Sequence, residues 1–189
     1  MNRIYDDNGF TLIELIVTIA IAAVVMGFAI PSFIGSIRSN RLTTNANEFV
    51  TTLKFAKSEA IKRGVQVTVR RKGPTSGVWE NGWDVFVDRD GNNSFNDDGD
   101  TTLCETNADG SPKEDCLLRT YDPLPAGMTL RTGASSHKDY TAYVASGMSN
   151  TVIGDTYRLC QGTDTVNSRA IVLNSVGRVY VTSPAASCP

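Results

Sequence analysis

An almost uninterrupted apolar run near the start of the chain limits what this sequence can fold into. The run extends from Phe10 to Ile30, and Glu14 is its only charged residue. A helix rises about 1.5 Å per residue, so a run of this length spans roughly 30 Å, the thickness of the hydrocarbon core of a bilayer. We therefore expect a helix that can cross a membrane, followed by a domain outside it.

Glu14 is an unusual residue for such a helix. A carboxylate within a membrane is costly to bury alone, so it indicates a functional contact with a partner. The alternative is a Glu that lies at the membrane interface and contacts only water. The polar residues 1–9 come before the apolar run and end with Gly9. A secretory signal is instead cut after its apolar core. Cleavage after Gly9 would leave the core attached to the chain.

The segment GFTLIEL, residues 9–15, resembles the processing site of type IV prepilins and pseudopilins. The resemblance implies that a prepilin peptidase removes residues 1–9 as a leader, cutting between Gly9 and Phe10, and N-methylates Phe10. It also implies that Glu14 pairs with the terminal amine of a neighbouring subunit in a filament, where an opposite charge makes a buried carboxylate tolerable. The implied partners are other major and minor pilins, the peptidase and an inner-membrane assembly platform. The implied location is the inner membrane, crossed once, with the β domain in the periplasm and later in the filament.

The remainder of the chain has the length of one soluble domain, of about 160 residues or fewer. The formal net charge of −2 gives no general argument for nucleic acid or for an acidic partner. We find no phosphate loop and no paired-carboxylate signature, and we expect neither an enzyme nor a cofactor. The one histidine, His137, lies in the loop-like residues 133–139. Ser, His and Asp lie close together in this loop, but the members of a catalytic triad come from separate parts of a chain. We therefore expect His137 to be an exposed loop residue rather than a catalytic one.

Four cysteines lie beyond the apolar run, and their even number in an exported domain predicts two disulfides. They are Cys104, Cys116, Cys160 and Cys188. Three pairings are formally possible. We favour Cys104 with Cys116 and Cys160 with Cys188, because each closes a short or terminal segment. Zinc is the competing interpretation, but the spacings do not fit a finger or a ribbon.

The helix is expected to continue past the membrane, with a kink rather than a stop between Gly27 and Pro31. Its membrane half is 10–31 and its amphipathic half is 32–63, and Gly64 is a good C-terminal stop. Apolar residues recur at alternating spacings of four and three, which places them on one helix face. They are Leu42, Ala46, Phe49, Leu53, Ala56 and Ala60. The stripe covers less than three heptads, so we expect packing on the protein's own sheet rather than a coiled coil.

From residue 64 to 189 the sequence changes to short β-type runs separated by turn-forming residues. The runs are Val65–Arg71, Trp83–Asp88, Leu117–Tyr121, Met128–Thr132, Tyr140–Ala145, Thr156–Cys160, Ala170–Leu173 and Arg178–Thr182. In the first run Val65, Val67 and Val69 alternate with polar residues, which predicts one buried sheet face. The expected fold class is therefore α+β, with the long N-terminal helix packed on a mostly antiparallel β-sheet domain.

The order of the loop and strand motifs narrows the resemblance to the GspH/FimT group of minor pseudopilins and to FimU-like minor pilins. The matching stretches are Val-Phe-Val-Asp at 85–88, the polar loop 89–100, Leu-Arg at 118–119, residues 122–127 and residues 173–178. This group implies a structural subunit of a type IV pilus, in a priming or tip complex. Its members serve pilus assembly, twitching motility, adhesion or DNA uptake. The alternatives are a type II secretion pseudopilin of the GspH kind and a pilus-associated DNA receptor of the FimT kind.

The polar loop starts like a calcium-binding loop, with Asp88, Asp90 and Asn92 at alternate positions. The sixth position, usually Gly, is Asn93, and the twelfth, usually a bidentate Glu, is Gly99. A solvated hairpin loop built of turn-forming residues explains the same composition, and we favour it over a weak calcium site.

DNA binding in the FimT kind uses a Gly-Arg-x-Arg motif near the C-terminus. Here the matching residues 177–180 are Gly-Arg-Val-Tyr, so only Arg178 is present. One Arg contributes little to a phosphate site that depends on several charges. Five other basic residues form two clusters in the sequence: Lys62, Arg63, Arg70, Arg71 and Lys72. We favour charged residues at a helix end and a strand edge over a DNA site.

Overall fold

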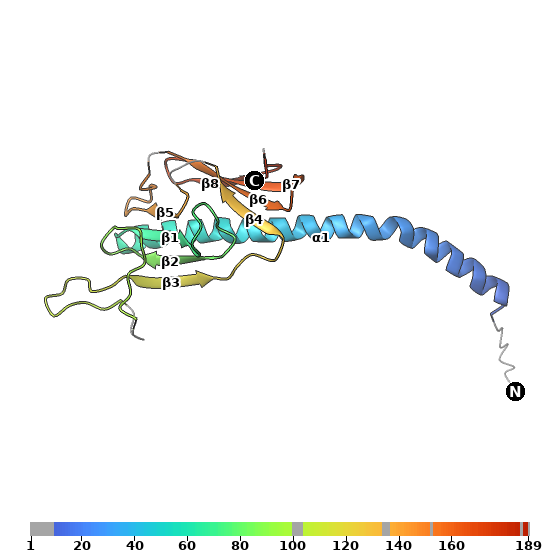
Figure 1. The fold of residues 1–189 in the computed structure, drawn as a ribbon, viewed down its shortest axis with the longest axis horizontal. Helices are drawn as coiled ribbons and strands as arrows, with labels where there is room; N and C mark the ends of the chain where they lie inside the picture. The colour runs from blue at the N-terminus through green and yellow to red at the C-terminus, as the bar shows by residue number, and fades with distance from the viewer. Residues whose placement is uncertain (1–9, 100–103, 134–136, 152, 186, 189) are drawn as a thin grey trace, which may run out of the picture. The chain divides into compact units, whose positions relative to one another are not determined.

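The computed structural model places one helix and eight strands within residues 10–99, 104–133, 137–151, 153–185 and 187–188, the parts of the chain that it describes. The chain divides into two compact units, Met1–Ser39 and Asn40–Pro189. The first contains the apolar start of the helix, and the second contains the helix end and all the strands (Figure 1).

The helix α1 runs from Leu12 to Arg63. It is not interrupted at Pro31, which agrees with the expectation that the helix does not stop there. It ends where Gly64 turns into the left-handed region, with φ of 68°. The backbone N–H of Gly64 donates to the carbonyl of Ala60 at 2.9 Å, which satisfies one of the last helix carbonyls.

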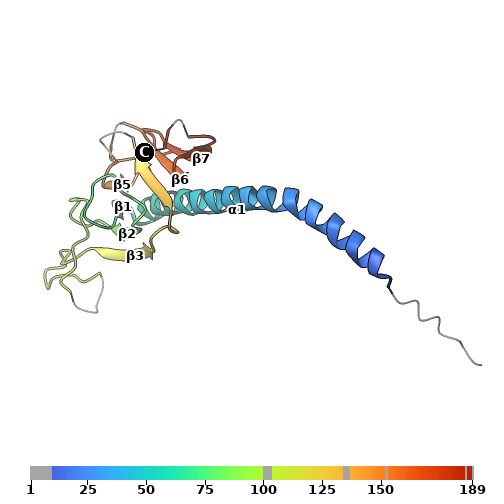
Figure 2. The ribbon, with the colours of Figure 1, turned by 45° about the vertical axis from the view of Figure 1, so that its right-hand side comes forward.

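The strands form two antiparallel four-stranded sheets. They are β1 (Val67–Arg71), β2 (Trp83–Val87), β3 (Cys116–Tyr121), β4 (Met128–Thr132), β5 (Tyr140–Tyr143), β6 (Asp155–Gln161), β7 (Asp164–Leu173) and β8 (Val179–Thr182). One sheet has the order β3-β2-β1-β5 and the other β4-β6-β7-β8. All eight predicted strands are present, with bounds shifted by a few residues. The segment between β2 and β3 leaves from the end of the pair where Val87 faces Cys116 (Figure 2).

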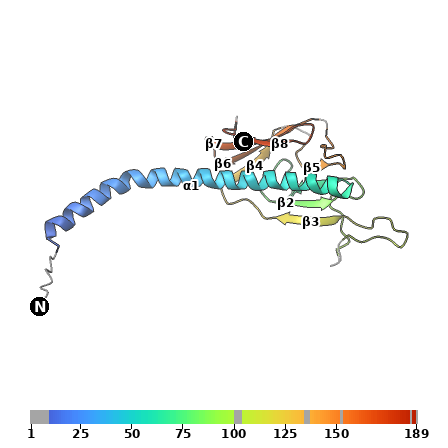
Figure 3. The same cartoon turned by 180° about the vertical axis from the view of Figure 1, so that it is seen from behind.

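Residues of both sheets pack on the second half of α1. Every residue of the predicted apolar stripe on the helix is buried, so that prediction is confirmed. The stripe shares one hydrophobic cluster with Val69 and Val85 of the first sheet and with Leu130 and Ile171 of the second. Figure 3 shows this part of α1 with β2 and β3 on one side and β4, β6 and β7 on the other.

Aromatic edges complete the core around Phe49. Its ring meets the rings of Trp79, Trp83 and Tyr157 edge to face, with centroids 5.5, 4.9 and 4.8 Å away. Edge-to-face contacts add stabilisation beyond burial alone, because the positive ring edge meets the negative ring face. Phe49 therefore joins the helix to aromatic side chains at the centre of the domain.

The first strand differs from the prediction of one buried face. Val65 lies outside β1 and is exposed, whereas Thr68, expected on the polar face, is 0% exposed. The hydroxyl of Thr68 donates to Asp88 Oδ2 at 2.8 Å. The polar loop after β2 thus supplies a buried acceptor on this side of the strand. The alternation of residue types within the strand cannot reveal this distant contact.

Candidate functional site

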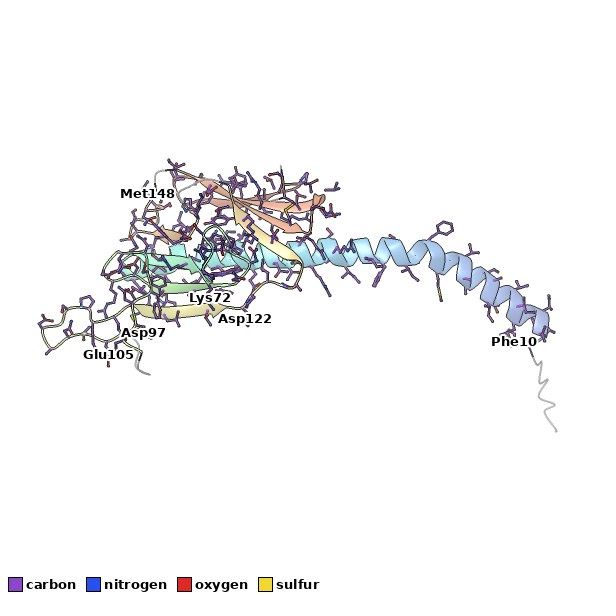
Figure 4. All side chains as sticks on the ribbon, in the orientation of Figure 1. Phe10, Lys72, Asp97, Glu105, Asp122 and Met148 are labelled. Carbon is purple, nitrogen blue, oxygen red and sulfur yellow. A yellow bond between two sulfur atoms is a disulfide. The ribbon has the colours of Figure 1, made fainter. Side chains whose placement is uncertain are left out.

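The helix is apolar on all sides between Leu12 and Ile37. Its large side chains are exposed within the unit, and the segment is long and apolar enough to cross a membrane by length and composition. Figure 4 shows side chains projecting all round this part of α1, with Phe10 labelled just before its first turn. Exposed apolar surface of this extent indicates contact with lipid or with other apolar helices.

Glu14 closes the first turn of α1 together with Thr11. The backbone N–H and the hydroxyl of Thr11 donate to Glu14 Oε2 at 3.0 and 2.9 Å. In return, the backbone N–H of Glu14 donates to the Thr11 hydroxyl at 3.3 Å. This is a capping box, in which Thr and Glu three residues apart satisfy free helix donors. The Thr-x-x-Glu spacing was visible in the sequence, although the prediction for Glu14 considered only a partner subunit or water.

Of the two residues that flank the expected cleavage site, the structure describes only Phe10. Gly9 lies outside the described residues, and Phe10 is 83% exposed next to the capped turn. The structure thus places Phe10 and Glu14 at the same end of the apolar helix. Cleavage, methylation and charge pairing remain predictions.

The four cysteines form two disulfides with the pairing favoured from the sequence. Cys104 joins Cys116, the first residue of β3, and Cys160 of β6 joins Cys188 in the C-terminal tail. The tail is also held by hydrogen bonds, since the backbone N–H of Ala185 donates to Ser168 Oγ at 2.8 Å. The first disulfide closes part of the connection between β2 and β3, and the second fixes the end of the chain to the second sheet.

The candidate calcium ligands only partly come together. Asp88 and Asp90 lie in one carboxylate group, but its third member is Asp115 rather than Asn92. Asn92 instead donates its side-chain N–H to Asp90 Oδ2 at 2.6 Å. Sequence reasoning missed Asp115 because it is far from the loop motif. A signal existed: Asp88 ends one predicted strand, and Asp115 lies just before the next.

The basic residues near the helix end and the first strand are engaged in local contacts. Lys62 and Arg63 form ion pairs with Glu59, and Arg71 and Lys72 with Asp139 and Asp84. Arg70 Nη1 donates to the carbonyl of Asn93 at 2.5 Å. Arg178 is exposed in the turn before β8. Because these neighbours already compete for the basic side chains, the geometry does not favour a phosphate-binding cluster.

His137 is 0% exposed, so the prediction of an exposed loop histidine is wrong. Its Nε2 lies 3.1 Å from the carbonyl of Ile153, and its Nδ1 lies 3.0 Å from the hydroxyl of Thr141. Thr141 also bonds the hydroxyl of Tyr157. These contacts fit a neutral ring that donates from Nε2 and accepts at Nδ1. Burial lowers the pKa of His137. Its two contacts join β5 to the segment just before β6.

Two family models match the chain. The family described as type II transport protein GspH matches residues 45–177, and the prokaryotic N-terminal methylation motif matches residues 5–30. The first covers the helix from residue 45 onward and most of the β domain. The second covers the apolar run and the residues before it. No curated protein sequence matches the chain.

Solved structures with similar folds include the type IV minor pilin FimU of Pseudomonas aeruginosa strain PAO1. In one crystal form the identity is 20% and the TM-score 0.57, with 79% of this chain and 96% of that chain covered. In a second crystal form the identity is 19% and the TM-score 0.55, with 78% of this chain and 100% of that chain covered. The minor pseudopilin EpsH of Vibrio cholerae shares 14% identity at a TM-score of 0.49, with 77% of this chain and 98% of that chain covered. The FimU matches show that the two proteins share a fold.

Proposed function

The chain belongs to the family of the type II transport protein GspH, and from that premise we propose that it is a minor subunit of a type IV pilus, in the priming or tip complex. Members with this methylation motif and fold are minor pilins or pseudopilins of type IV pili or type II secretion systems. They are structural subunits that assemble with other pilins, not enzymes. Within that class, the likeness of fold to the minor pilin FimU supports the pilus.

The observation that carries the proposal is the exposed apolar helix with a single charge in its first turn. An apolar surface on all sides is not left in water, so lipid covers it before assembly and neighbouring helices cover it afterwards. Glu14 is then the only carboxylate in this surface. A carboxylate among packed apolar helices is tolerated when an opposite charge neutralises it. The amine of a processed Phe10 on an adjoining subunit is the proposed charge.

The proposal includes the route by which the subunit reaches the filament. A prepilin peptidase cuts between Gly9 and Phe10 and methylates Phe10, and the helix then holds the protein in the inner membrane. The β domain lies in the periplasm, where its two disulfides form. An assembly platform in the inner membrane moves the subunit into the filament. The match to the methylation motif supports this processing step.

A second candidate is a pseudopilin of a type II secretion system, which the match to the GspH family over residues 45–177 favours. Deleting the encoding gene separates the two. We expect surface pili and twitching motility to be lost, and secretion of exported enzymes to continue. Secretion lost with pili intact would assign the chain to the second candidate. Re-expression of the full chain from a plasmid must restore the lost property.

A further inference from the structure

The pairing of β2 with β3 brings two aspartates from distant parts of the sequence to one place. Val87 ends β2 and faces Cys116, which begins β3. Asp88 directly follows Val87, and Asp115 directly precedes Cys116. The long connection between the strands therefore starts and ends with a carboxylate at the same end of the strand pair.

Both carboxylates are buried, and one oxygen has no partner. Asp88 and Asp115 are each 2% exposed. Asp88 Oδ2 accepts from the side chain of Gln66 at 2.8 Å, from the hydroxyl of Thr68 at 2.8 Å and from the backbone N–H of Asn93 at 2.9 Å. Its Oδ1 is buried and accepts no hydrogen bond. A buried carboxylate oxygen without a donor is costly, so this atom indicates a missing electropositive partner.

Asp90 supplies a third carboxylate at the same point. One oxygen each from Asp88, Asp90 and Asp115 lies within 4.8 Å of the others. Asp115 is oriented by two backbone donors, the N–H of Arg89 at 2.8 Å and that of Asn96 at 3.0 Å. Hydrogen bonds therefore hold the buried carboxylates of Asp88 and Asp115 in place, and the exposed Asp90 lies beside them.

No ion pair among the residues that the structure describes neutralises these three carboxylates. The nearby Lys113 is paired with Asp98 at 2.6 Å and with Glu105. The guanidinium of Arg89 donates to the carbonyl of Glu105 at 2.8 Å. The two local cations are thus engaged elsewhere, while three acidic groups share one site.

We propose that Asp88, Asp90 and Asp115 bind a calcium ion at the base of the β2–β3 connection. Calcium binds oxygen ligands at about 2.3–2.6 Å, so two ligands of one ion lie at most about 5 Å apart. The three carboxylate oxygens meet this condition, because all lie within 4.8 Å of one another. The three residues offer only carboxylate oxygens, which disfavours zinc and copper. A pocket of about 110 Å³ borders the site and is lined in part by Asp90, Asn96 and Asp115, which leaves room for water ligands.

The ion would join the two ends of the connection to each other. Asp88 and Asp90 lie at its start, and Asp115 at its end, next to the disulfide between Cys104 and Cys116. Calcium and the disulfide then hold the same part of the fold by independent means. The role proposed for calcium is to hold the two ends of this connection together. It is separate from the assembly role of the helix.

The test uses the full chain purified in detergent, stripped of metal with a chelator and titrated with calcium chloride. We expect one binding event in calorimetry, with a dissociation constant on the order of 10⁻⁴–10⁻³ M, as in extracellular calcium modules. The melting temperature should rise as calcium exceeds that value. Magnesium at the same concentrations should have a much smaller effect, and an equal effect would overturn the assignment to calcium.

Two variants and a matched control decide whether these residues are the ligands. Asp90→Asn changes an exposed residue and leaves the buried network intact, and Asp115→Asn removes a buried ligand. Both should weaken calcium binding at least tenfold. Asp122→Asn makes the same change of charge after the opposite end of β3, where Figure 4 labels the residue, and should bind as the unmodified protein does. A calcium response retained in Asp90→Asn, or absent from the unmodified protein, would overturn the proposal.

Discussion

Thr11 and Glu14 satisfy each other's hydrogen-bonding groups in the first turn of α1, so Glu14 has a partner within its own chain. This bonding gives the carboxylate a structural role that does not need a neighbouring subunit. An effect of removing Glu14 is therefore not evidence of charge pairing unless the capping role is kept intact. The two roles can be separated, because Gln also completes a capping box but carries no charge.

Glu14→Gln should reduce incorporation into filaments to roughly a tenth or less, because a buried amine without its counter-charge is strongly destabilising. Glu14→Ala should have a similar effect. Thr11→Val removes the hydroxyl contacts but keeps the charge, and it should assemble nearly normally. The measurement is the amount of the subunit in sheared filaments relative to membranes. Filament recovery of Glu14→Gln equal to that of the unmodified chain would refute charge pairing.

Gly9→Val should leave the leader attached, because the resemblance places Gly9 directly before the scissile bond. Mass spectrometry of the membrane-extracted protein reports the N-terminus, and we expect methylated Phe10 in the unmodified chain but not in Gly9→Val. Gly27→Val is the matched control: it makes the same substitution within the helix, where a new Cβ meets nothing within 4 Å. It should be processed normally. A mature N-terminus other than Phe10 would refute the predicted cleavage site.

Removing either disulfide should lower the free energy of unfolding by about 2–4 kcal/mol, and the larger loop should give the larger loss. The pair Cys160 and Cys188 is 28 residues apart, and the pair Cys104 and Cys116 is 12 apart. Replacing each pair by two serines and following unfolding in denaturant compares them directly. Free thiols detected by alkylation in the unmodified exported protein would contradict both bonds.

His137 should make the protein less stable at acidic pH. Burial lowers the pKa of its imidazole below the ordinary 6.5, so the unfolded chain takes up a proton before the folded chain does. The stabilisation is complete above about pH 6.5 and decreases as the pH falls towards the folded-state pKa. Between about pH 7.5 and about pH 5.5 we expect this residue to lower the free energy of unfolding, by at most about 1.4 kcal/mol.

The control for this prediction is His137→Gln, which cannot titrate. It should be less stable at neutral pH because the contacts to Thr141 and Ile153 are disturbed. Its stability should nevertheless depend less on pH than that of the unmodified protein. Denaturant unfolding at both pH values gives the comparison, and equal slopes for the two proteins would rule out His137 as the titrating group.

Local patterns in the sequence predicted the helix and strands well, because each depends on a repeat of residue types along a short segment. The stripe from Leu42 to Ala60 needed only the helical period, and it is buried as expected. Thr68 and His137 were placed wrongly for a shared reason. Their burial involves segments distant in the chain, the polar loop after β2 in one case and the segment just before β6 in the other. Polar residues give no local sign of such contacts.

The candidate calcium site, too, could be predicted only in part from local sequence patterns. The calcium-like spacing identified Asp88 and Asp90, but the ligand that completes the group is Asp115, which only the pairing of two strands brings close. Asn92 fits the sequence motif and instead bonds Asp90. Choosing Asp115 over Asn92 as the third ligand would have required the register of the β2–β3 pair, which the sequence pattern does not give.

The connection between β2 and β3 is closed at its base by strand pairing and by a disulfide, which makes it a suitable place for inserted sequence. Lengthening a loop whose ends are already fixed costs little, because closure entropy grows only slowly with length. Gly110 is exposed on this connection, and a Cβ atom added there would meet nothing within 4 Å. A short epitope inserted at Gly110 should therefore leave both sheets and α1 undisturbed. It would allow single subunits to be located by antibody labelling along intact filaments.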